Sequence, residues 1–429
     1  MRVRDSFHDD RLPDTIYSAT CNDLQAFSRL EGNVRVQVVI VGGGFTGIAA
    51  AVELAERGYT VAVVEQNLIG WGSSGRCSGL IEGGAGPDIS KFNDYSAIFG
   101  AAQAKAVWEL GNSSVDIIKD RVKKYEIDCD LAWGHVETAT SKKQVRRLQE
   151  KADALAGLGY APKLQLFKGS ETEENLGSQS LSGGLLNMGW GHCHPLNLVR
   201  GEARVAERLG VKIFEDARVN DIACGKKVVV DTGHGKVTAD IALLAGNAYL
   251  GDLVPGLAQK QLIVDSYAAV TEPLSEELLQ KINPHKYAFS GSGKYSEHYR
   301  VTQDNRFLYS GLVNFSGRHP KDVKGQLKRK IQALFPELAK VALPYVWGGK
   351  TGVGKNEVPQ IGKIAGNVYY AQAYSRREIA QAHLAAHSIV EAIDGNLRYF
   401  SALASVKHTA FTGGKFFKRP IFAAKMFFT

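Results

Sequence analysis

Three glycines and one glutamate near the start of the chain have the spacing of a dinucleotide-binding site. Gly42, Gly44 and Gly47 form G-x-G-x-x-G between an apolar run and a segment of helix formers. In this motif the first glycine permits a tight turn, the second lets the backbone approach a pyrophosphate, and the third lets the helix pack closely on the strand. Glu65 stands where an acidic side chain accepts hydrogen bonds from an adenosine ribose. Because an acidic residue there disfavours a 2′-phosphate, the pattern predicts FAD or NAD rather than NADP.

The elements that must position these residues are a strand, a helix and a second strand. Residues 36–41 are an almost continuous apolar run, which is typical of a strand buried on both faces of a parallel sheet. Residues 48–57 are helix formers, and residues 60–64 form the second apolar strand. The helix N-terminus offers N–H groups and the positive end of its dipole to phosphates. The alternative, a glycine-rich turn in an ordinary βαβ unit, does not account for Glu65.

The composition is that of a globular chain with room for two domains. The 429 residues are 44% hydrophobic and 22% charged, with a net charge of +8. The five cysteines are scattered, and no pair has C-x-x-C or metal-ligand spacing, so we expect reduced thiols, a cytoplasmic location and no metal. We also expect no signal peptide, no transmembrane helix and no nucleic-acid partner.

The two ends of the chain differ from the middle. Residues 1–33 read as an irregular lead-in that wraps the surface. Residues 396–429 interleave lysines with phenylalanines. The favoured interpretation is that the aromatic side chains pack on the body while the lysines stay in water, and the alternative is peripheral contact with a membrane or an anionic partner.

From about residue 261 the pattern changes and predicts a second domain. Strand-like runs recur with turn residues between them, which indicates an antiparallel sheet. A short strand at 368–370 and a long helix at 378–393 then return to an α/β pattern. The predicted fold class is α/β (α+β overall), with a Rossmann-like dinucleotide-binding domain built from discontinuous segments and a substrate domain with a mainly antiparallel β-sheet. The predicted dinucleotide-binding segments are 34–90, 190–260 and 340–395, and the substrate segments are 91–189 and 261–339.

The stretch IGWGSSGRCSG, residues 69–79, resembles the second flavin-contacting loop of the D-amino-acid-oxidase-like family of FAD oxidoreductases. The resemblance covers nearly all of the chain from about Val36 and returns in longer runs, among them HCHPLNL and YRVTQDNRFLY. It is strongest to an amine-oxidising member that takes part in polyamine breakdown. The resemblance implies that the dinucleotide is FAD. It also implies noncovalent binding, although Cys77 and His192 are conceivable attachment points.

The resemblance assigns cofactor contacts by position. The residues expected to hold the pyrophosphate are Gly42, Gly43, Gly44, Phe45, Thr46 and Gly47. Those expected on the adenosine side are Glu65, Gln66, Val219, Ala245 and Gly246. Those expected to contact the pyrophosphate and the flavin are Gly72, Ser73, Ser74, Gly75, Arg76 and Cys77.

The chain departs from the family pattern in a late loop before the last long helix. The family has glycines there, whereas this chain reads Ala373 to Glu378. If the backbone needs positive φ angles, the side chains in this loop carry strain. We expect Ser375 beside the flavin, and Arg376 or Arg377 to supply positive charge to the flavin or its phosphates. The alternative is that both arginines face solvent.

A second departure concerns the substrate. Amino-acid oxidases of the family place an arginine after Trp-x-Gly to grip a carboxylate, and the corresponding position here is Thr351. Lys350 beside it forms no fork, which disfavours a simple α-amino acid. Glu357 either holds a substrate ammonium or is exposed. Tyr299 and Arg300 are further pocket candidates, the alternative being a strand tyrosine and a surface arginine.

We therefore expect an FAD-dependent amine oxidoreductase that acts on a small-molecule amine, which the resemblance extends to a polyamine or a gamma-glutamyl polyamine. A hydride passes to flavin N5 from the carbon next to the nitrogen, and water hydrolyses the resulting imine. No single catalytic acid or base is assigned, and oxygen is one candidate electron acceptor. The alternatives are a glycine/sarcosine-type amino-acid oxidase and a flavin-binding protein with lost or highly restricted turnover.

Overall fold

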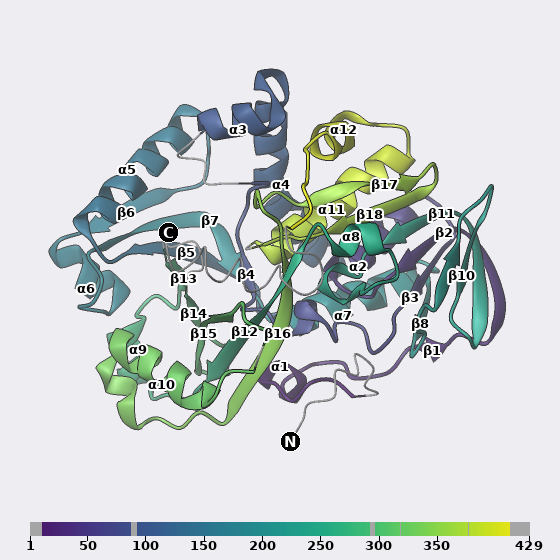
Figure 1. Cartoon of the computed structure of the whole chain (residues 1–429). Coiled ribbons are helices and arrows are strands. Elements are labelled where there is room, and N and C mark those ends of the chain that lie inside the picture. Colours follow the sequence, from purple (N-terminus) through teal and green to yellow (C-terminus); the bar gives the residue numbers. More distant parts are fainter. Residues whose placement is uncertain (1–10, 87–91, 292–296, 318, 376, 412–429) are drawn as a thin grey trace.

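The computed structural model describes residues 11–86, 92–291, 297–317, 319–375 and 377–411, with the backbone alone at 92–95, 101 and 102. The described chain forms two nine-stranded sheets that stand on opposite sides of Figure 1. Helices α2, α4, α7 and α11 lie beside the first sheet, while α5, α9 and α10 lie beside the second (Figure 1). The predicted mixture of an α/β domain and a mainly antiparallel sheet is confirmed.

The first sheet contains the predicted βαβ unit. Its strand order is β1-β8-β3-β2-β11-β10-β9, with β18 also paired to β11 and β17 to β18. The central strands pair in parallel because each is an apolar run that is buried on both faces. The bounds of its strands are β1 (Ser28–Arg29), β2 (Gly32–Val41), β3 (Val61–Val64), β8 (Lys212–Glu215), β9 (Asp221–Ala223), β10 (Val228–Asp231), β11 (Gly235–Leu244), β17 (Gln360–Ala365) and β18 (Val368–Gln372).

Four helices pack together beside this sheet and share its largest apolar core. They are α2 (Phe45–Glu56), α4 (Ala101–Tyr125), α7 (Pro195–Arg208) and α11 (Glu378–Ile393), and the last has the predicted bounds. A buried network of charges joins them: Arg121 donates to Glu53 at 2.9 Å and to Glu202 at 3.0 Å, and His383 lies 3.0 Å from Glu202. Because each buried charge has an opposite partner, the network holds the four helices in one arrangement.

The second sheet has the order β16-β12-β15-β14-β13-β5-β7-β4, with β6 paired to β7. Its pairs are antiparallel except for β13 with β5. The bounds of its strands are β4 (Leu80–Ile81), β5 (Ala132–Ala139), β6 (Leu164–Lys168), β7 (Gly183–His192), β12 (Leu262–Val270), β13 (Ala288–Gly291), β14 (His298–Val301), β15 (Phe307–Asn314) and β16 (Tyr345–Val353). Other helices are α3 (Phe92–Phe99), α5 (Lys142–Gly157), α6 (Ser170–Leu176), α8 (Pro255–Ala258), α9 (Glu276–Ile282) and α10 (Val323–Leu334).

Three segments lie differently from the sequence prediction. β4 and β16 were assigned to the dinucleotide-binding segments 34–90 and 340–395, but they pair with strands of the second sheet. α4 lies in the predicted substrate segment 91–189, yet its apolar side joins the core beside the first sheet. Position along the chain does not show to which sheet a strand belongs, because segments of the two sheets alternate in the sequence.

The ends of the described chain are attached to the body. In the lead-in, α1 (Ile16–Ala19) is capped by Thr15, and β1 pairs in parallel with β8. After α12 (Arg398–Ala404), Phe411 is buried against Leu262 and Val353, while Lys407 is exposed. This part agrees with aromatic packing, and the other predicted basic and aromatic positions, 412–429, lie outside the described residues. Within the described chain, no helix is both long and apolar enough to span a bilayer.

Candidate active site

A cavity of about 520 Å³ opens where β2, β3 and β11 end. It lies at the carboxyl edge of the parallel strands, where open α/β sheets bind their ligands. The residues of the predicted cofactor site that line it are Gly42, Gly43, Gly44, Phe45, Thr46, Glu65, Gln66, Gly72, Ser73, Ser74, Val219, Ala245 and Gly246. The structure therefore brings together residues from five separate stretches of the sequence.

The glycine motif shapes the floor of this cavity. Gly42 has φ +115°, and a Cβ there would stand 2.9 Å from the carbonyl of Ala245. A Cβ on Gly47 would stand 2.0 Å from the oxygen of Gly42, so only hydrogen permits α2 to approach β2 this closely. Gly44 precedes α2 and offers no side-chain cap to its first turn. A pyrophosphate thus fits against the start of the helix.

Glu65 stands at the end of β3 with its carboxylate in the cavity. It accepts hydrogen bonds from the backbone N–H of Gly43 at 2.7 Å and of Asn67 at 3.0 Å. Burial raises the pKa of this carboxyl. The side chain is fixed between the glycine loop and the strand end, in the position that a ribose-binding acid requires.

The second glycine-rich loop docks onto the first. It contains the short helix η1 (Ser73–Gly75), and Ser74 Oγ accepts a hydrogen bond from the N–H of Phe45 at 3.1 Å. Gly47 and Gly75 line neither of the two cavities formed by described residues; a Cβ on Gly75 would instead overlap the oxygen of Gly70 at 2.3 Å. These close approaches give both glycines a packing role, and their predicted contact with the cofactor stays a prediction.

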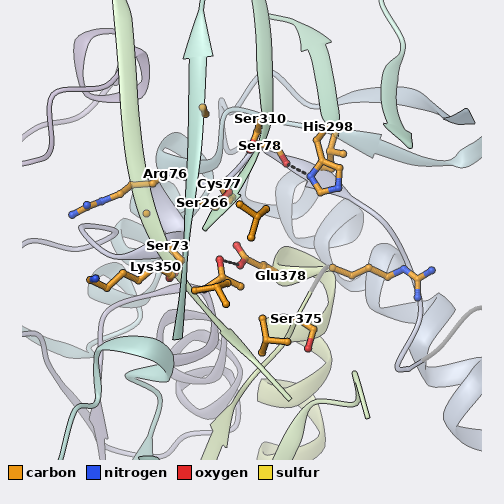
Figure 2. Close-up of a pocket in the computed structure, with 18 of the residues that line it drawn as sticks. Ser73, Arg76, Cys77, Ser78, Ser266, His298, Ser310, Lys350, Ser375 and Glu378 are labelled. Carbon is orange, nitrogen blue, oxygen red and sulfur yellow. Dashed lines mark hydrogen bonds between the residues drawn. The ribbon is translucent and has the colours of Figure 1, made fainter. Parts of the chain in front are cut away.

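A smaller cavity of about 110 Å³ lies between this loop, the second sheet and the start of α11. Ser73 and Glu378 line both cavities, so they mark the place where the two spaces adjoin. Figure 2 shows the Glu378 carboxyl among these side chains, with Ser375 to one side and Ser78 and His298 to the other. The titratable residues that line the smaller cavity are Arg76, Cys77, Glu82, Tyr267, His298, Lys350, Glu357, Arg377 and Glu378.

Two positively charged side chains of the smaller cavity, those of Arg76 and Lys350, have partners within the chain. The Arg76 guanidinium lies 4.2 Å from the centre of the Trp71 ring and donates to the carbonyls of Trp71 and Gly348. Lys350 Nζ lies 3.0 Å from Asp265 Oδ1. These contacts fix the Arg76 side chain and show that the charge of Lys350 is balanced within the chain, while the predicted contact of Arg76 with the cofactor stays a prediction.

The candidates Lys350, Thr351 and Glu357 line the smaller cavity, whereas Tyr299 and Arg300 line neither cavity of the described chain. Tyr299 stacks on Phe289 with ring centres 4.7 Å apart, inside the core of the second sheet. The prediction for this pair of residues is therefore corrected. Successive side chains on a strand point to opposite faces of the sheet. The resemblance of the run YRVTQDNRFLY to the family therefore did not show which of its residues faces the pocket.

Arg300 has a structural position instead. It is buried, and it donates to the carbonyl of Ser78 at 2.8 Å and to that of Cys193 at 2.9 Å. It also reaches the hydroxyl of Tyr17 at 3.3 Å. Arg300 thereby ties the flavin-side loop to α1 and to the start of α7.

The late loop has the strained backbone that the sequence indicated. Ala373 has φ +61° and Ser375 has φ +62°, both in the left-handed region that favours glycine. Ser375 lines the smaller cavity, and its Oγ accepts from the N–H of Gly354 at 3.3 Å. Its contact with the flavin stays a prediction. In the larger cavity, Tyr374 is bonded to Thr46 at 2.5 Å, which attaches the loop to the first turn of α2.

Of the two arginines of this loop, Arg376 lies outside the described residues. Arg377 faces inward: its Nε lies 3.7 Å from Glu82 Oε2, and it donates to the carbonyl of Gly86 at 3.1 Å. Burial disfavours the charge of Glu82, but His135, His298 and Arg377 hold its pKa well below the usual range. The positive charge of Arg377 is thus balanced by the Glu82 carboxylate in the wall of the smaller cavity.

Glu378 lines both cavities, and the sequence analysis did not select it as a site residue. It is the first residue of α11, and its Oε1 accepts a hydrogen bond from Thr351 Oγ1 at 2.7 Å. Burial raises the pKa of Glu378 to about 7, although the Thr351 hydroxyl lowers it in part. The available signal was the replacement of a family glycine by an ionisable residue. The residues beside Glu378, Thr351 on β16 and Ser73 in η1, are distant from it in sequence, so the sequence alone did not show this arrangement.

The glycine motif, the glutamate at the end of β3 and the larger cavity between them define a dinucleotide-binding protein. A family model described as FAD dependent oxidoreductase (DAO) matches residues 37–392. The chain belongs to this family. Its cofactor is FAD, and the residues around the larger cavity fit that group: a glycine floor at a helix start, a ribose-facing acid and a second loop that leads to the smaller cavity.

Relatives of known name support this placement. The chain is 34% identical over 408 residues to gamma-glutamylputrescine oxidoreductase of Escherichia coli (strain K12), which covers 95% of each chain. It is 31% identical to the probable oxidoreductase OrdL of Haemophilus influenzae, over 89% of this chain and 88% of that one. The similarity to an enzyme of polyamine chemistry that the sequence indicated is confirmed, and the protein is an FAD-dependent oxidoreductase.

Solved structures show the same fold. Glycine oxidase from Geobacillus kaustophilus has a TM-score of 0.69 at 20% identity, and the match covers 84% of this chain and 95% of that one. L-proline dehydrogenase from P.horikoshii also has a TM-score of 0.69, at 19% identity, with coverage of 85% and 94%. At this identity the likeness concerns the backbone, and the substrate has to be argued from the cavity itself.

Proposed function

We propose that the protein oxidises an amine that binds in the smaller cavity, while FAD occupies the larger one. The observation that carries this proposal is that Ser73 and Glu378 line both cavities, which supports a substrate bound directly beside the cofactor. FAD, when bound, accepts a hydride from the carbon next to an unprotonated nitrogen, and the resulting imine is hydrolysed by water. The chain has to hold that carbon in place, exclude water and manage the proton on the nitrogen.

The charge of the cavity favours an amine over an α-amino acid. At the position where the family's amino-acid oxidases have an arginine, this chain has Thr351 bonded to Glu378. Arg76 and Lys350 are engaged by backbone oxygens and by Asp265, so a substrate carboxylate would have to displace an existing partner. A carboxylate at the junction instead attracts a cationic group.

The rest of the lining suits a chain with polar groups beyond the reacting amine. Apolar side chains such as Leu80, Val264 and Ile379 can cover a methylene chain, while Ser266 and Ser310 offer hydroxyls further along the second sheet. This lining, with the similarity to a gamma-glutamylputrescine oxidoreductase, supports a polyamine or a gamma-glutamyl polyamine as substrate. We include in the proposal that FAD is bound without a covalent bond and that the enzyme works in the cytoplasm.

The test is an anaerobic titration of the purified protein with amines, followed by its visible spectrum. The panel contains putrescine, spermidine, gamma-glutamylputrescine, glycine, sarcosine and proline. Bleaching of the oxidised flavin peaks by one of the first three is expected. Bleaching by glycine or sarcosine alone would replace the proposal with an amino-acid oxidase, and bleaching by none would indicate a flavin protein with lost or restricted turnover. A colourless protein that takes up no added FAD would overturn the reading of the larger cavity.

A further inference from the structure

We propose that Glu378 is the catalytic residue that receives the substrate's ammonium group and removes its proton. The inference rests on the proposed function, because it assumes an amine in the smaller cavity. It goes beyond that function by assigning the proton transfer to one carboxyl. In the transfer an N–H bond of the ammonium breaks and an O–H bond forms on the Glu378 carboxylate, so that an ion pair becomes a neutral amine and a neutral acid.

The position of Glu378 is the first support for this role. It is one of two residues that line both cavities of the described chain, and the other, Ser73, is occupied by its hydrogen bond to the Lys350 carbonyl at 2.6 Å. A nitrogen bonded to the Glu378 carboxylate therefore lies at the junction, with the adjoining carbon beside the cofactor space. Neither His298 nor Glu82, which line the smaller cavity, lines the larger one.

The surroundings of Glu378 are the second support. Within the described chain, its hydrogen-bonding partner is the neutral hydroxyl of Thr351. By contrast, Glu82 is balanced by His135 at 3.2 Å and by Arg377 at 3.7 Å. The titratable groups that share the smaller cavity with Glu378 are Arg76 and Cys77 after η1, Glu82 after β4, Tyr267 on β12, His298 on β14, Lys350 on β16, Glu357 after β16 and Arg377 before α11.

Protonation energetics agree with this geometry. Burial raises the pKa of Glu378 to about 7, and the nearby Glu378 charge adds to the burial that raises the pKa of Cys77 to about 12. An alkylamine in water has a pKa of about 10 and reaches the cavity as an ammonium ion. In a buried site the neutral pair is favoured over the ion pair more than in water, because burial penalises both charges. The carboxyl is therefore suited to accept the proton near neutral pH.

The test measures binding of tert-butylammonium to the holoenzyme by the change in flavin absorbance. The carbon next to this nitrogen carries no hydrogen, so the probe binds without being oxidised. If only the carboxylate binds the probe, the competent fraction rises from about one tenth at pH 6 to about nine tenths at pH 8, and the apparent Kd falls about tenfold. We expect Glu378→Gln to weaken binding about 10- to 100-fold at pH 8 and to abolish the pH dependence.

Two further variants control this experiment. Glu357→Gln removes another carboxyl of the same cavity and should keep the pH dependence. Thr351→Val removes the hydrogen bond that lowers the pKa of Glu378, so the midpoint of the binding curve should move to higher pH. The Thr351→Val result also decides the matter if Glu378→Gln does not fold. A Glu378→Gln protein with wild-type affinity and pH dependence, or an unmoved midpoint in Thr351→Val, would overturn the inference.

The amine panel separates this inference from the proposed function. If no amine reduces the flavin of the wild-type enzyme, the proposed function itself fails. If an amine reduces the wild type, and if Glu378→Gln is reduced at the same rate with the same pH profile, the assignment of Glu378 fails alone. Loss of reduction near pH 7 in Glu378→Gln, recovered at pH values where the free amine predominates, is the expected outcome.

Discussion

The close packing of α2 on β2 leads to a testable prediction about Gly47 and Gly44 of the first glycine motif. In Gly47→Ala the new Cβ would stand 2.0 Å from the backbone oxygen of Gly42, where ordinary contact is 3.4–4 Å. The obstructing atom belongs to the backbone, so the helix itself has to move by roughly 1.4 Å. In Gly44→Ala the nearest atom is the Ser74 hydroxyl at 2.9 Å, which can rotate away if it gives up its hydrogen bond from the N–H of Phe45.

These distances predict different losses in the two variants. An overpacked site costs about 1–3 kcal/mol, and Gly47→Ala should lose at least this much stability as well as its FAD. Gly44→Ala should lose less stability than Gly47→Ala, about 1 kcal/mol, because Gly44 has φ −90° and the displaced Ser74 hydroxyl gives up one hydrogen bond. Its added methyl group lies between the glycine loop and Ser74 in the cofactor cavity. A cost of about 1–3 kcal/mol against the bound cofactor corresponds to about 5- to 150-fold weaker FAD binding.

The assay is thermal unfolding of each apoprotein, followed by fluorescence titration with FAD. Gly157→Ala is the matched control, because a Cβ there meets nothing within 4 Å, and it should be neutral or slightly stabilising. If Gly47→Ala unfolds and binds FAD like the wild type, the argument from close approach is wrong. If Gly44→Ala loses stability but not affinity, the cavity at Gly44 is not the pyrophosphate site.

Three further predictions concern Glu65, Arg300 and the bond between the flavin and the protein. Glu65→Gln should weaken FAD binding about 10- to 100-fold in the same titration, because its amide would turn an N–H group toward the N–H of Gly43 or of Asn67; an unchanged Kd would remove Glu65 from the ribose site. Arg300→Met should lower the melting temperature, at a cost of about 2–5 kcal/mol, because buried carbonyls lose their donor. Normal stability with lost turnover in that variant would return Arg300 to the substrate pocket. Acid precipitation should release all flavin into the supernatant, and flavin that stays with the pellet would show a covalent bond, with Cys77 as the first residue to examine.

Much of the cofactor site was predictable because its signals are local. The apolar run, the spacing of the glycines and the acidic residue at the end of the second strand all lie between residues 36 and 65, and the structure places them in one βαβ unit. The second loop was found through its resemblance to flavin-contacting loops, and Ser73 and Ser74 do line the cavity. Positive φ at Ala373 was also foreseeable, since the family has glycines in this loop.

The substrate side could not be predicted in this way. Whether Tyr299 or Arg300 lines the pocket depends on the pairing register of β14 with β13 and β15. In the structure both side chains are buried among other groups of the protein. Strand β16 reads like part of the second half of the cofactor domain, yet it pairs along its full length with β12. These outcomes depend on strand pairing between distant segments, which the local pattern does not contain.

The glycine spacing and Glu65 by themselves limited the cofactor to FAD or NAD, because a dinucleotide is held mainly by backbone groups whose positions follow from glycine spacing and from one strand–helix turn. The resemblance of residues 69–79 to a flavin-contacting loop then indicated FAD. Only the tertiary structure decided the character of the substrate site. Glu378, Thr351 and Ser73 come from a helix start, a strand and a loop, and their contacts across long stretches of sequence place a carboxyl of raised pKa at the junction of the two cavities. Burial and the absence of a charged partner among the described residues give that carboxyl its properties, and both arise where the start of α11 meets β16 of the second sheet.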